Sequence, residues 1–570
     1  MDISSSQRRT TWQARELHER VTPDRWCVTL SDLKFLKSSV ESSIDSGAIK
    51  PPANGSDVFS SEDRLYGPSI YTVTEQHIKP VTALAGKMSW ALMRNPNGLD
   101  CDLFISHAWQ EGIFEFMSKV LHSWPRFMRH AWCCMLANPQ HLDIAAMLQS
   151  PRHSPFAIAL EASKVVLAVP NRCCSIYTRL WCAYEAYLAE EQDKIILIAR
   201  ASNRYDICQS MVKMASAAIV GMLLGWAINF GHATVTFNLV FLCIATVAAA
   251  WSMGTTRDCH RKWLHLLGEA LCWFLIFDWY TVHGQWEKTY AYLHQFTAIQ
   301  QRLWLLLFAG AFCFLEVDRL NGLAALQESE QLGQGYRGSI VHATCTRQED
   351  DEQIRREIGR RVADVDYAIK VLLEAGMSSP ALRSIACKGV SIDQAANPQI
   401  TLPLLVLVPL NLINVVATLF DIFYLDDDHW ERKSMGATSI LVRCLILCML
   451  YRKTRDERCF TYLVIQKLST VYLASLTPRL MVWELSANTT VAATPNGLMP
   501  VMSFQLLTYS FCFFFAVLGI RGTASLPGCG LCLLRMIMAR SFRACCHVRH
   551  GMSCGSAESE SDSESWSSSS

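Results

Sequence analysis

The sequence carries little charge and almost no charge imbalance. Charged residues make up 18% of the 570 residues and the net charge at pH 7 is +1, so the composition gives no support for nucleic-acid binding. No glycine-rich phosphate loop stands beside the strand-end residues Ser106 and His107, which removes the argument for a kinase, an NTPase or a hydride-transfer enzyme. The N-terminal segment MDISSSQRRTTWQ has no apolar run, so we expect no cleaved signal peptide.

Hydrophobic residues, by contrast, reach 51% of the chain, and 23 residues are cysteines. This balance fits a chain that is partly soluble and partly embedded in lipid. Many cysteines lie in apolar runs or in adjacent pairs such as Cys133-Cys134 and Cys173-Cys174. This placement favours free thiols in a reducing compartment over a disulfide framework.

The first 205 residues divide into a polar arm and an α/β domain. Residues 1–97 are Ser-rich and interrupted by prolines, so we expect a partly disordered arm with short helices near 30–46 and 73–93. In residues 98–205, apolar runs of strand length alternate with helical patterns, which predicts a parallel sheet covered by helices on both faces. The expected strands are CDLFIS, AWCCMLA, KVVLAVP and KIILIA, and the expected helices are 110–122, 156–163 and 177–191.

Eight stretches after residue 208 are apolar enough and nearly long enough to cross a bilayer. We expect four transmembrane helices in 208–317, a cytosolic helical connector in 318–400 and four more transmembrane helices in 401–520. The stretches are roughly 212–230, 235–253, 263–281, 298–317, 401–424, 436–451, 460–477 and 500–520. The sixth and seventh are the weakest, because they contain Arg443 and Lys467.

Charged residues within or at the edges of these stretches allow two interpretations. They could line a path for an ion or solute, or they could pair inside the bundle as structural contacts. The second interpretation pairs Arg443 or Lys467 with Glu269 and places Glu316 and Asp318 at a cytosolic edge. No broken-helix repeat is visible that would favour transport.

The distribution of basic residues predicts that both termini are cytosolic. If the α/β domain is cytosolic, the short cytosolic loops and the segment 521–550 hold 12 Lys and Arg residues, whereas the opposite loops hold four. The sequon Asn488-Thr489-Thr490 then lies on the lumenal side, where glycosylation occurs. We therefore expect a multi-pass membrane protein whose soluble segments face the cytosol.

Two cytosolic segments carry further patterns. In the connector, apolar residues recur every three or four positions, which predicts one helix over 349–375 whose apolar face packs on its own domain or serves self-association or partner binding. Thr346 and Glu349 fit a capping box at its start, and Gly376 is placed to end it.

The last segment, 521–570, should be a basic, Cys-containing juxtamembrane stretch followed by a disordered acidic, Ser-rich tail. The Cys529-x-x-Cys532 pair and the Cys/His cluster after it resemble a zinc-ligand spacing. The flanking residues are apolar and basic, which favours lipidation or plain thiols, so we expect no metal site.

Three segments of the α/β domain resemble the Toll/interleukin-1 receptor (TIR) family. DLFISH at 102–107 is similar to the first strand and turn of TIR domains, and LEASKVVLAVP at 160–170 is similar to a later helix end and strand. SIYTRLWCAYE at 175–185 is the most specific, because a Ser/Tyr loop, a Trp-Cys pair and a Glu follow in the family's order. The resemblance covers about 100 of the 570 residues, and the whole arrangement is similar to membrane-bound TIR-like proteins of single-celled eukaryotes.

The resemblance implies a flavodoxin-like fold and association with itself or with other TIR-like domains. In some members it also implies cleavage of NAD at the bond to nicotinamide, and Glu185 matches the glutamate that contacts the ribose in those enzymes. A carboxylate at the carboxyl edge of a parallel sheet lies where such folds bind ligands, and it could stabilise the charge that develops as nicotinamide leaves. Ser106, His107 and Trp181 are then the residues expected to bind NAD, here a substrate and not a resident cofactor.

Three functions remain open at this point. The first is signalling or scaffolding by domain association at a membrane. The second is a membrane-anchored NAD-cleaving enzyme, although ANPQHLDIAAMLQSPRHSP, after the second strand, lacks the glycine and the acidic pair usual in those members. Without that activity, Glu185 would be a helix-surface charge and Trp181 a core residue. The third function is a channel or transporter regulated by the soluble domain.

Overall fold

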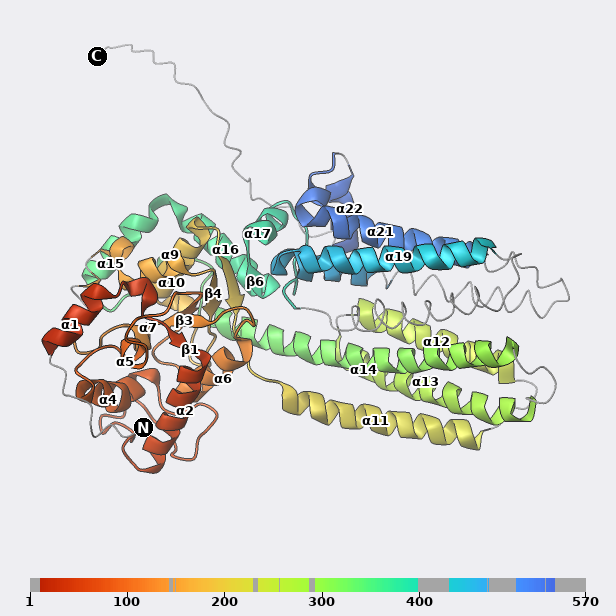
Figure 1. The fold of residues 1–570 in the computed structure, drawn as a ribbon, viewed down its shortest axis with the longest axis horizontal. Coiled ribbons are helices and arrows are strands. Elements are labelled where there is room, and N and C mark those ends of the chain that lie inside the picture. Colours follow the sequence, from red (N-terminus) through yellow and green to blue (C-terminus); the bar gives the residue numbers. More distant parts are fainter. Residues whose placement is uncertain are drawn as a thin grey trace, which may run out of the picture.

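The described part of the chain forms an α/β head from which long helices extend (Figure 1). The computed structural model describes residues 11–142, 147–148, 150–228, 234–255, 257–286, 293–397, 430–468, 470, 499–527 and 529–538. These described residues are mostly helical, and their strands all belong to the head.

A six-stranded mixed sheet lies at the centre of the head, in the order β1-β3-β2-β4-β5-β6. The inner four strands are parallel, and the short edge strands β1 and β6 pair antiparallel with their neighbours. The strands are β1 (Val28–Thr29), β2 (Leu103–Ser106), β3 (His130–Cys133), β4 (Val165–Ala168), β5 (Ile195–Ile198) and β6 (Met377–Ser378). The four strands expected in 98–205 therefore form and are parallel. The sheet as a whole is mixed, because two further strands from outside that range pair antiparallel at its edges.

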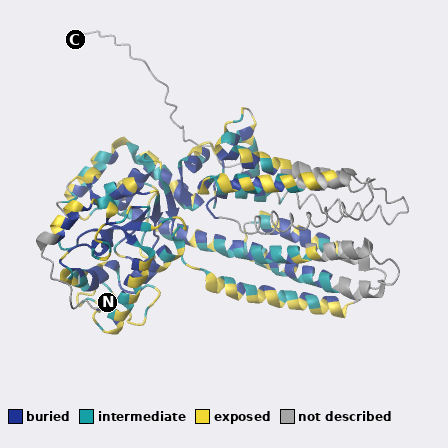
Figure 2. Cartoon of the chain, in the orientation of Figure 1, coloured by how far each residue is buried: buried dark blue, intermediate teal, exposed yellow. Residues whose placement is uncertain are grey.

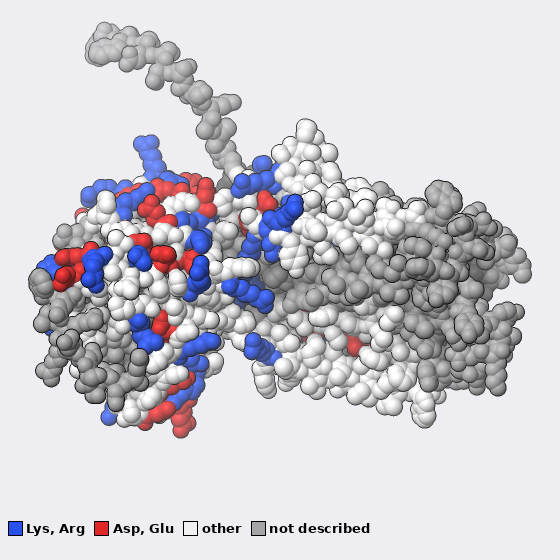
Figure 3. All heavy atoms as spheres, viewed as in Figure 1, with Lys and Arg blue, Asp and Glu red and all other residues white. Residues whose placement is uncertain are grey.

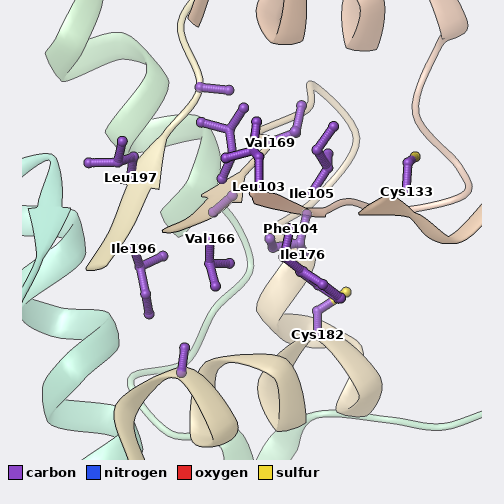
Figure 4. Packing of buried hydrophobic residues seen from close by; sticks show 14 of the residues in the cluster. Leu103, Phe104, Ile105, Cys133, Val166, Val169, Ile176, Cys182, Ile196 and Leu197 are labelled. Atoms are coloured by element: carbon purple, nitrogen blue, oxygen red, sulfur yellow. The ribbon is translucent and has the colours of Figure 1, made fainter. Parts of the chain in front are cut away.

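Alternation along the strands explains the two apolar faces of the sheet. Phe104, Val166 and Ile196 are in register across β2, β4 and β5. They point to the same face, toward Cys182 and the helix that carries it (Figure 4). The inner strands are almost completely buried, as expected for parallel strands covered by helices on both faces.

Helices from three parts of the sequence cover this sheet. The expected helices of the α/β domain appear as α6 (Ile113–Ser123), α9 (Pro155–Ala162) and α10 (Leu180–Glu191). The AWCCMLA run is a strand only to Cys133 and continues as α7 (Cys134–Ala137). The helices of the N-terminal segment are α1 (Thr11–Arg20), α2 (Leu30–Asp45), α3 (Ile70–Val73), α4 (Lys79–Leu84) and α5 (Trp90–Arg94).

Over residues 11–97 the N-terminal segment is folded onto the head, where a partly disordered arm was expected. The hydrophobic side of α2, with Leu33, Leu36 and Val40, is buried in the same core as the sheet. A capping box between Thr29 and Asp32 starts α2. Pro51, Pro52 and Pro68 lie in the segment between α2 and α3, and the flanking helices are ordered by packing in the core of the head.

The expected connector also belongs to the head. It supplies β6, and its helices α15 (Gln348–Ile358), α16 (Val362–Ala375) and α17 (Pro380–Cys387) share buried residues with the sheet's core. The single helix expected over 349–375 is broken at Gly359, whose φ of 52° is left-handed. The capping box does not form, since Arg347 is the N-cap and makes no side-chain cap. Gly376 ends α16 as predicted, with φ 77° and its N–H bonded to the Leu372 carbonyl.

Truncating a buried residue of this apolar stripe should destabilise the head. Val365 is fully buried, so Val365→Ala is expected to cost about 2 kcal/mol of folding free energy through lost contacts and the cavity left behind. The matched change Val341→Ala, at a residue that is 55% exposed, should stay within about 0.5 kcal/mol. Chemical denaturation of the full chain in detergent measures both. Equal effects of the two changes would show that the stripe does not pack on the head.

Further helices of the described residues lie in or beside the long bundle, and one of them, from residue 455 to 468, has no label in Figure 1. The others are α11 (Arg204–Ala227), α12 (Thr234–Gly254), α13 (Asp258–Trp286), α14 (Leu293–Gly333), α19 (Trp430–Arg452), α21 (Met499–Ala524) and the short α22 (Gly530–Met538). Six of the expected apolar stretches coincide with long helices; the stretch 401–424 lies outside the described residues, as does most of 469–477. Within the described residues, only α11 is long and apolar enough overall to cross a membrane, and Val240–Gly254 and Ser510–Ala524 are shorter apolar helices. The multi-pass topology therefore stays a prediction.

Candidate functional site

The two strongest candidates from the sequence, Ser106 and Glu185, are in contact. Ser106 ends β2 and donates a hydrogen bond from Oγ to Glu185 Oε2 at 2.5 Å. Glu185 lies on α10, the helix that faces Phe104, Val166 and Ile196 on one side of the sheet (Figure 4). Both side chains are buried, Glu185 with 5% of its surface exposed. After β2 the chain adds β3 on one side of it and β4 on the other, and α/β sheets bind ligands at such a switch point. The contact therefore lies at the sheet edge where the sequence analysis expected a site.

His107 joins this cluster through residues that sequence reasoning did not select. Its Nε2 lies 3.1 Å from Cys134 Sγ, and its Nδ1 lies 3.1 Å from Glu111 Oε1. The indole N–H of Trp109 also points to Cys134 Sγ, at 3.3 Å. Glu111 is fully buried, and neither of its carboxylate oxygens has a hydrogen bond. The four-residue spacing of His107 and Glu111, and a cysteine at the end of a strand, were the available signals.

Burial keeps the ionisable groups of this cluster neutral. It raises the pKa of Glu185 to about 8, although the Ser106 hydrogen bond and the Arg179 charge oppose the shift. It lowers the pKa of His107 to about 3 and raises that of Cys134 to about 12. Burial also holds the pKa of Glu111 well above its ordinary value. At pH 7 the cluster therefore contains mainly a protonated Glu185 and a neutral imidazole and thiol.

Trp181 lies apart from these residues. Its indole N–H donates to Asp350 Oδ2 at 3.3 Å, which ties α10 to α15. Its ring stacks on Phe156, with ring centroids 5.3 Å apart. The structure thus brings together Ser106, His107 and Glu185, while Trp181 serves the interface with the C-terminal part of the head.

A glycine-rich segment packs against the loop that precedes α10. Residues 333–338, GQGYRG, follow the helix α14 and not a strand, so they lack the context of a dinucleotide-binding turn. The Gln334 carbonyl accepts a hydrogen bond from the Ser175 N–H, and the Tyr336 hydroxyl donates to Asp366. These contacts give the segment a structural role in docking the end of α14 on the loop before α10.

The charged residues of the long helices pair differently from the sequence interpretation. Glu269 accepts hydrogen bonds from Trp273 and Cys313, not from Arg443 or Lys467. Glu316 is bonded to Arg319 and to His265 Nδ1, the latter at 2.7 Å. Arg443, like Glu316 and Asp318, is buried.

Neither of two cavities in the described structure includes Glu185. The larger, of about 680 Å³, is a shallow hollow between α2 and the segment 59–64. The smaller, of about 50 Å³, lies where the head meets the long helices. Within the described residues, no group of three or more His, Cys, Asp or Glu side chains is placed to hold a metal ion.

Comparison of the chain with protein-family models, with curated proteins and with solved structures finds no match. The TIR-like interpretation therefore stays a prediction from the sequence segments.

Proposed function

We propose that this protein is a multi-pass membrane protein that presents a cytosolic TIR-like head for signalling or scaffolding through domain association. The observation that carries the proposal is the separation of two surfaces. Charged side chains gather over the head and its junction with the helices, whereas the visible described surface of the long helices is nearly free of them (Figure 3).

The long helices expose apolar side chains that would be unfavourable in water. Figure 2 shows exposed residues along α11, whose buried positions are few. Trp226 on this helix is 71% exposed, and Trp251 on α12 is 59% exposed. The large apolar residues exposed on α11, α12 and α21 include Val212, Ile219, Val220, Leu223, Leu224, Ile244, Val247, Phe511, Phe514 and Val517. Continuous exposed apolar surface of this kind supports contact with lipid.

The contacts between these helices also support a membrane bundle. A Cβ at Gly221 of α11 would lie 2.0 Å from the Ala270 carbonyl oxygen of α13, so glycine is needed for that close approach. Gly268 of α13 similarly makes room for the ring of Phe312 of α14. Small residues at helix crossings are typical of membrane bundles, in which packing and not hydrophobic burial drives association.

The head favours association over NAD cleavage. Its four parallel strands, with β2 between β3 and β4, agree with the flavodoxin-like order that the TIR resemblance implies. Cleavage of NAD would need an ionised carboxylate open to the ribose. Glu185 is buried and mainly protonated at neutral pH, so it offers neither the charge nor the access.

The proposal is tested by membrane extraction and by association of the heads. The full chain should stay in the membrane pellet after alkaline carbonate and leave it only with detergent. Tags at both termini should be digestible on sealed microsomes, because basic residues hold the flanking segments on the cytosolic side. In vesicles, energy transfer between differently labelled heads should rise with protein density more steeply than for a single-span control of equal density. Release by carbonate, a protected N-terminal tag, or transfer equal to the control would each count against it.

A further inference from the structure

Arginines without a carboxylate partner gather where the head meets the long helices. Arg200 lies two residues after the end of β5, and Arg455 and Arg458 lie in the first turn of the helix that begins at residue 455. Figure 3 shows basic side chains at this junction. Among the described residues, the three arginines form no ion pair with a carboxylate. The Arg200 guanidinium donates instead to Asn397 Oδ1 at 3.2 Å, and Arg458 donates to backbone carbonyls.

The three arginines lie close together in space although they are distant in sequence. Burial raises the pKa of the Cys459 thiol, and the positive charges of all three arginines oppose that shift. Burial lowers the pKa of Arg200, and the nearby charge of Arg455 lowers it further. Two carboxylates lie near the cluster: the charge of Asp456 acts on Cys459, and the charge of Glu328, which is paired with Lys119, acts on Arg200. Positive charge that no ion pair neutralises favours an anion.

The small cavity at this junction offers room and a free donor. It has a volume of about 50 Å³ and is lined by Arg200, Gly376 and Asn397 among others, which is more space than one water needs. Asn397 is 4% exposed, and its Nδ2 has no hydrogen-bond acceptor. A buried N–H without an acceptor is energetically unfavourable, so a ligand with an oxygen atom that accepts from Asn397 Nδ2 would be favoured here. Glu374 and Asp393 stand on the rim, both exposed to solvent.

We propose that this junction binds a phosphate group, with the Arg200 guanidinium and the Asn397 amide as donors in the cavity and with Arg455 and Arg458 beside it. Arginine suits this role because its planar N–H groups match phosphate oxygens. The assignment of the ligand rests on the proposed function: in a membrane-inserted chain the junction lies at the level of the lipid headgroups, so the phosphate belongs to a phosphomonoester lipid. A soluble phosphate compound would offer the same chemistry.

The test measures binding of defined probes to the full chain in neutral detergent. The probes are short-chain phosphatidylinositol 4-phosphate, short-chain phosphatidylcholine and inorganic phosphate. The phosphomonoester lipid should bind saturably and phosphatidylcholine should not. Arg200→Gln and Arg455→Gln should each weaken the Kd about tenfold, the loss of one charge-assisted contact. The control Arg126→Gln, at an exposed arginine on the head, should leave the Kd unchanged.

The outcomes separate the site from the membrane proposal. Binding of the lipid but not of inorganic phosphate assigns the site to a headgroup, whereas equal binding of both assigns it to a soluble phosphate; in either case the arginine variants must weaken it. Because Arg455 is exposed, its variant tests the site without removing a buried group. Absence of saturable binding, or equal binding by both variants and the control, overturns the phosphate site. If the chain nevertheless resists carbonate extraction, the membrane proposal stands.

Discussion

Replacement of Glu185 by Gln is expected to stabilise the protein at pH 8 and to leave its stability nearly unchanged at pH 4.5. The pKa of this carboxyl is raised from 4.5 to about 8 in the folded chain, chiefly by burial. Below pH 4.5 the group is protonated in both folded and unfolded states, so it makes no difference. As the pH rises toward 8, the unfolded state loses its proton and the folded state keeps it, so the wild-type free energy of unfolding falls, by on the order of 4 kcal/mol in total.

The difference in melting temperature between the two proteins, followed by tryptophan fluorescence from pH 4.5 to pH 8, checks this expectation. It should widen to roughly 5–10 °C in favour of Glu185→Gln. The effect of His107, whose neutral form burial also favours, cancels in the comparison because both proteins contain it. A matched change at the exposed Glu62 should show no such trend. A constant difference across the range would mean that Glu185 is ionised and hydrated.

The same pair of proteins addresses NAD cleavage. With Glu185 buried and protonated, neither the wild type nor the glutamine variant should release nicotinamide from NAD above the rate of a detergent blank, even when crowded on vesicles. The full chain must be used, because residues 1–205 lack β6 and the helices α15–α17 that share the head's core. Release by the wild type that is lost in Glu185→Gln would establish the enzyme and overturn the association proposal.

Replacement of Lys119 by Met is expected to cost about 3–5 kcal/mol of stability and to loosen α14 from the head. Lys119, on α6, is 3% exposed and its Nζ lies 2.6 Å from Glu328 Oε2 and 3.1 Å from Glu115 Oε1. It also donates to Gln331 Oε1 at 2.7 Å and to the Pro170 carbonyl at 2.9 Å. Methionine fills the space but leaves two buried carboxylates without a counter-charge.

Two measurements, a control variant and a double variant test the prediction for Lys119→Met. Denaturation reports the stability, and limited proteolysis reports whether the end of α14 becomes accessible. Lys34→Met, at an exposed position of α2, should change neither. Adding Glu328→Gln to Lys119→Met should restore part of the lost stability, because one of the unpaired charges is removed. If Lys119→Met behaves like Lys34→Met, the buried network does not hold α14 to the head.

Local patterns in the sequence were sufficient for the inner part of the fold. The four parallel strands and α6, α9 and α10 follow from apolar runs and helical spacing, because each run must be buried on a sheet or helix face. The resemblance and the position at a strand end also selected Glu185 and Ser106 as candidate site residues, but their hydrogen bond was set by the packing of α10 against the sheet. The left-handed C-cap at Gly376 was likewise a local property of one residue.

Only the tertiary structure decided what depends on contacts between distant segments. The edge strands β1 and β6 are two residues long, and they exist because β3 and β5 offer unpaired edges, which no local pattern records. The neighbours of His107 were set by where α7 and the turn after β2 come together, and the direction of Trp181 by the docking of α15. The sequence by itself determined which residues must be buried and which segments are helical or extended. Their partners were determined by the packing of the whole chain. The hydrophobic effect is not directional, so an apolar side chain can be buried against many different neighbours, whereas a hydrogen bond between distant residues requires one particular geometry.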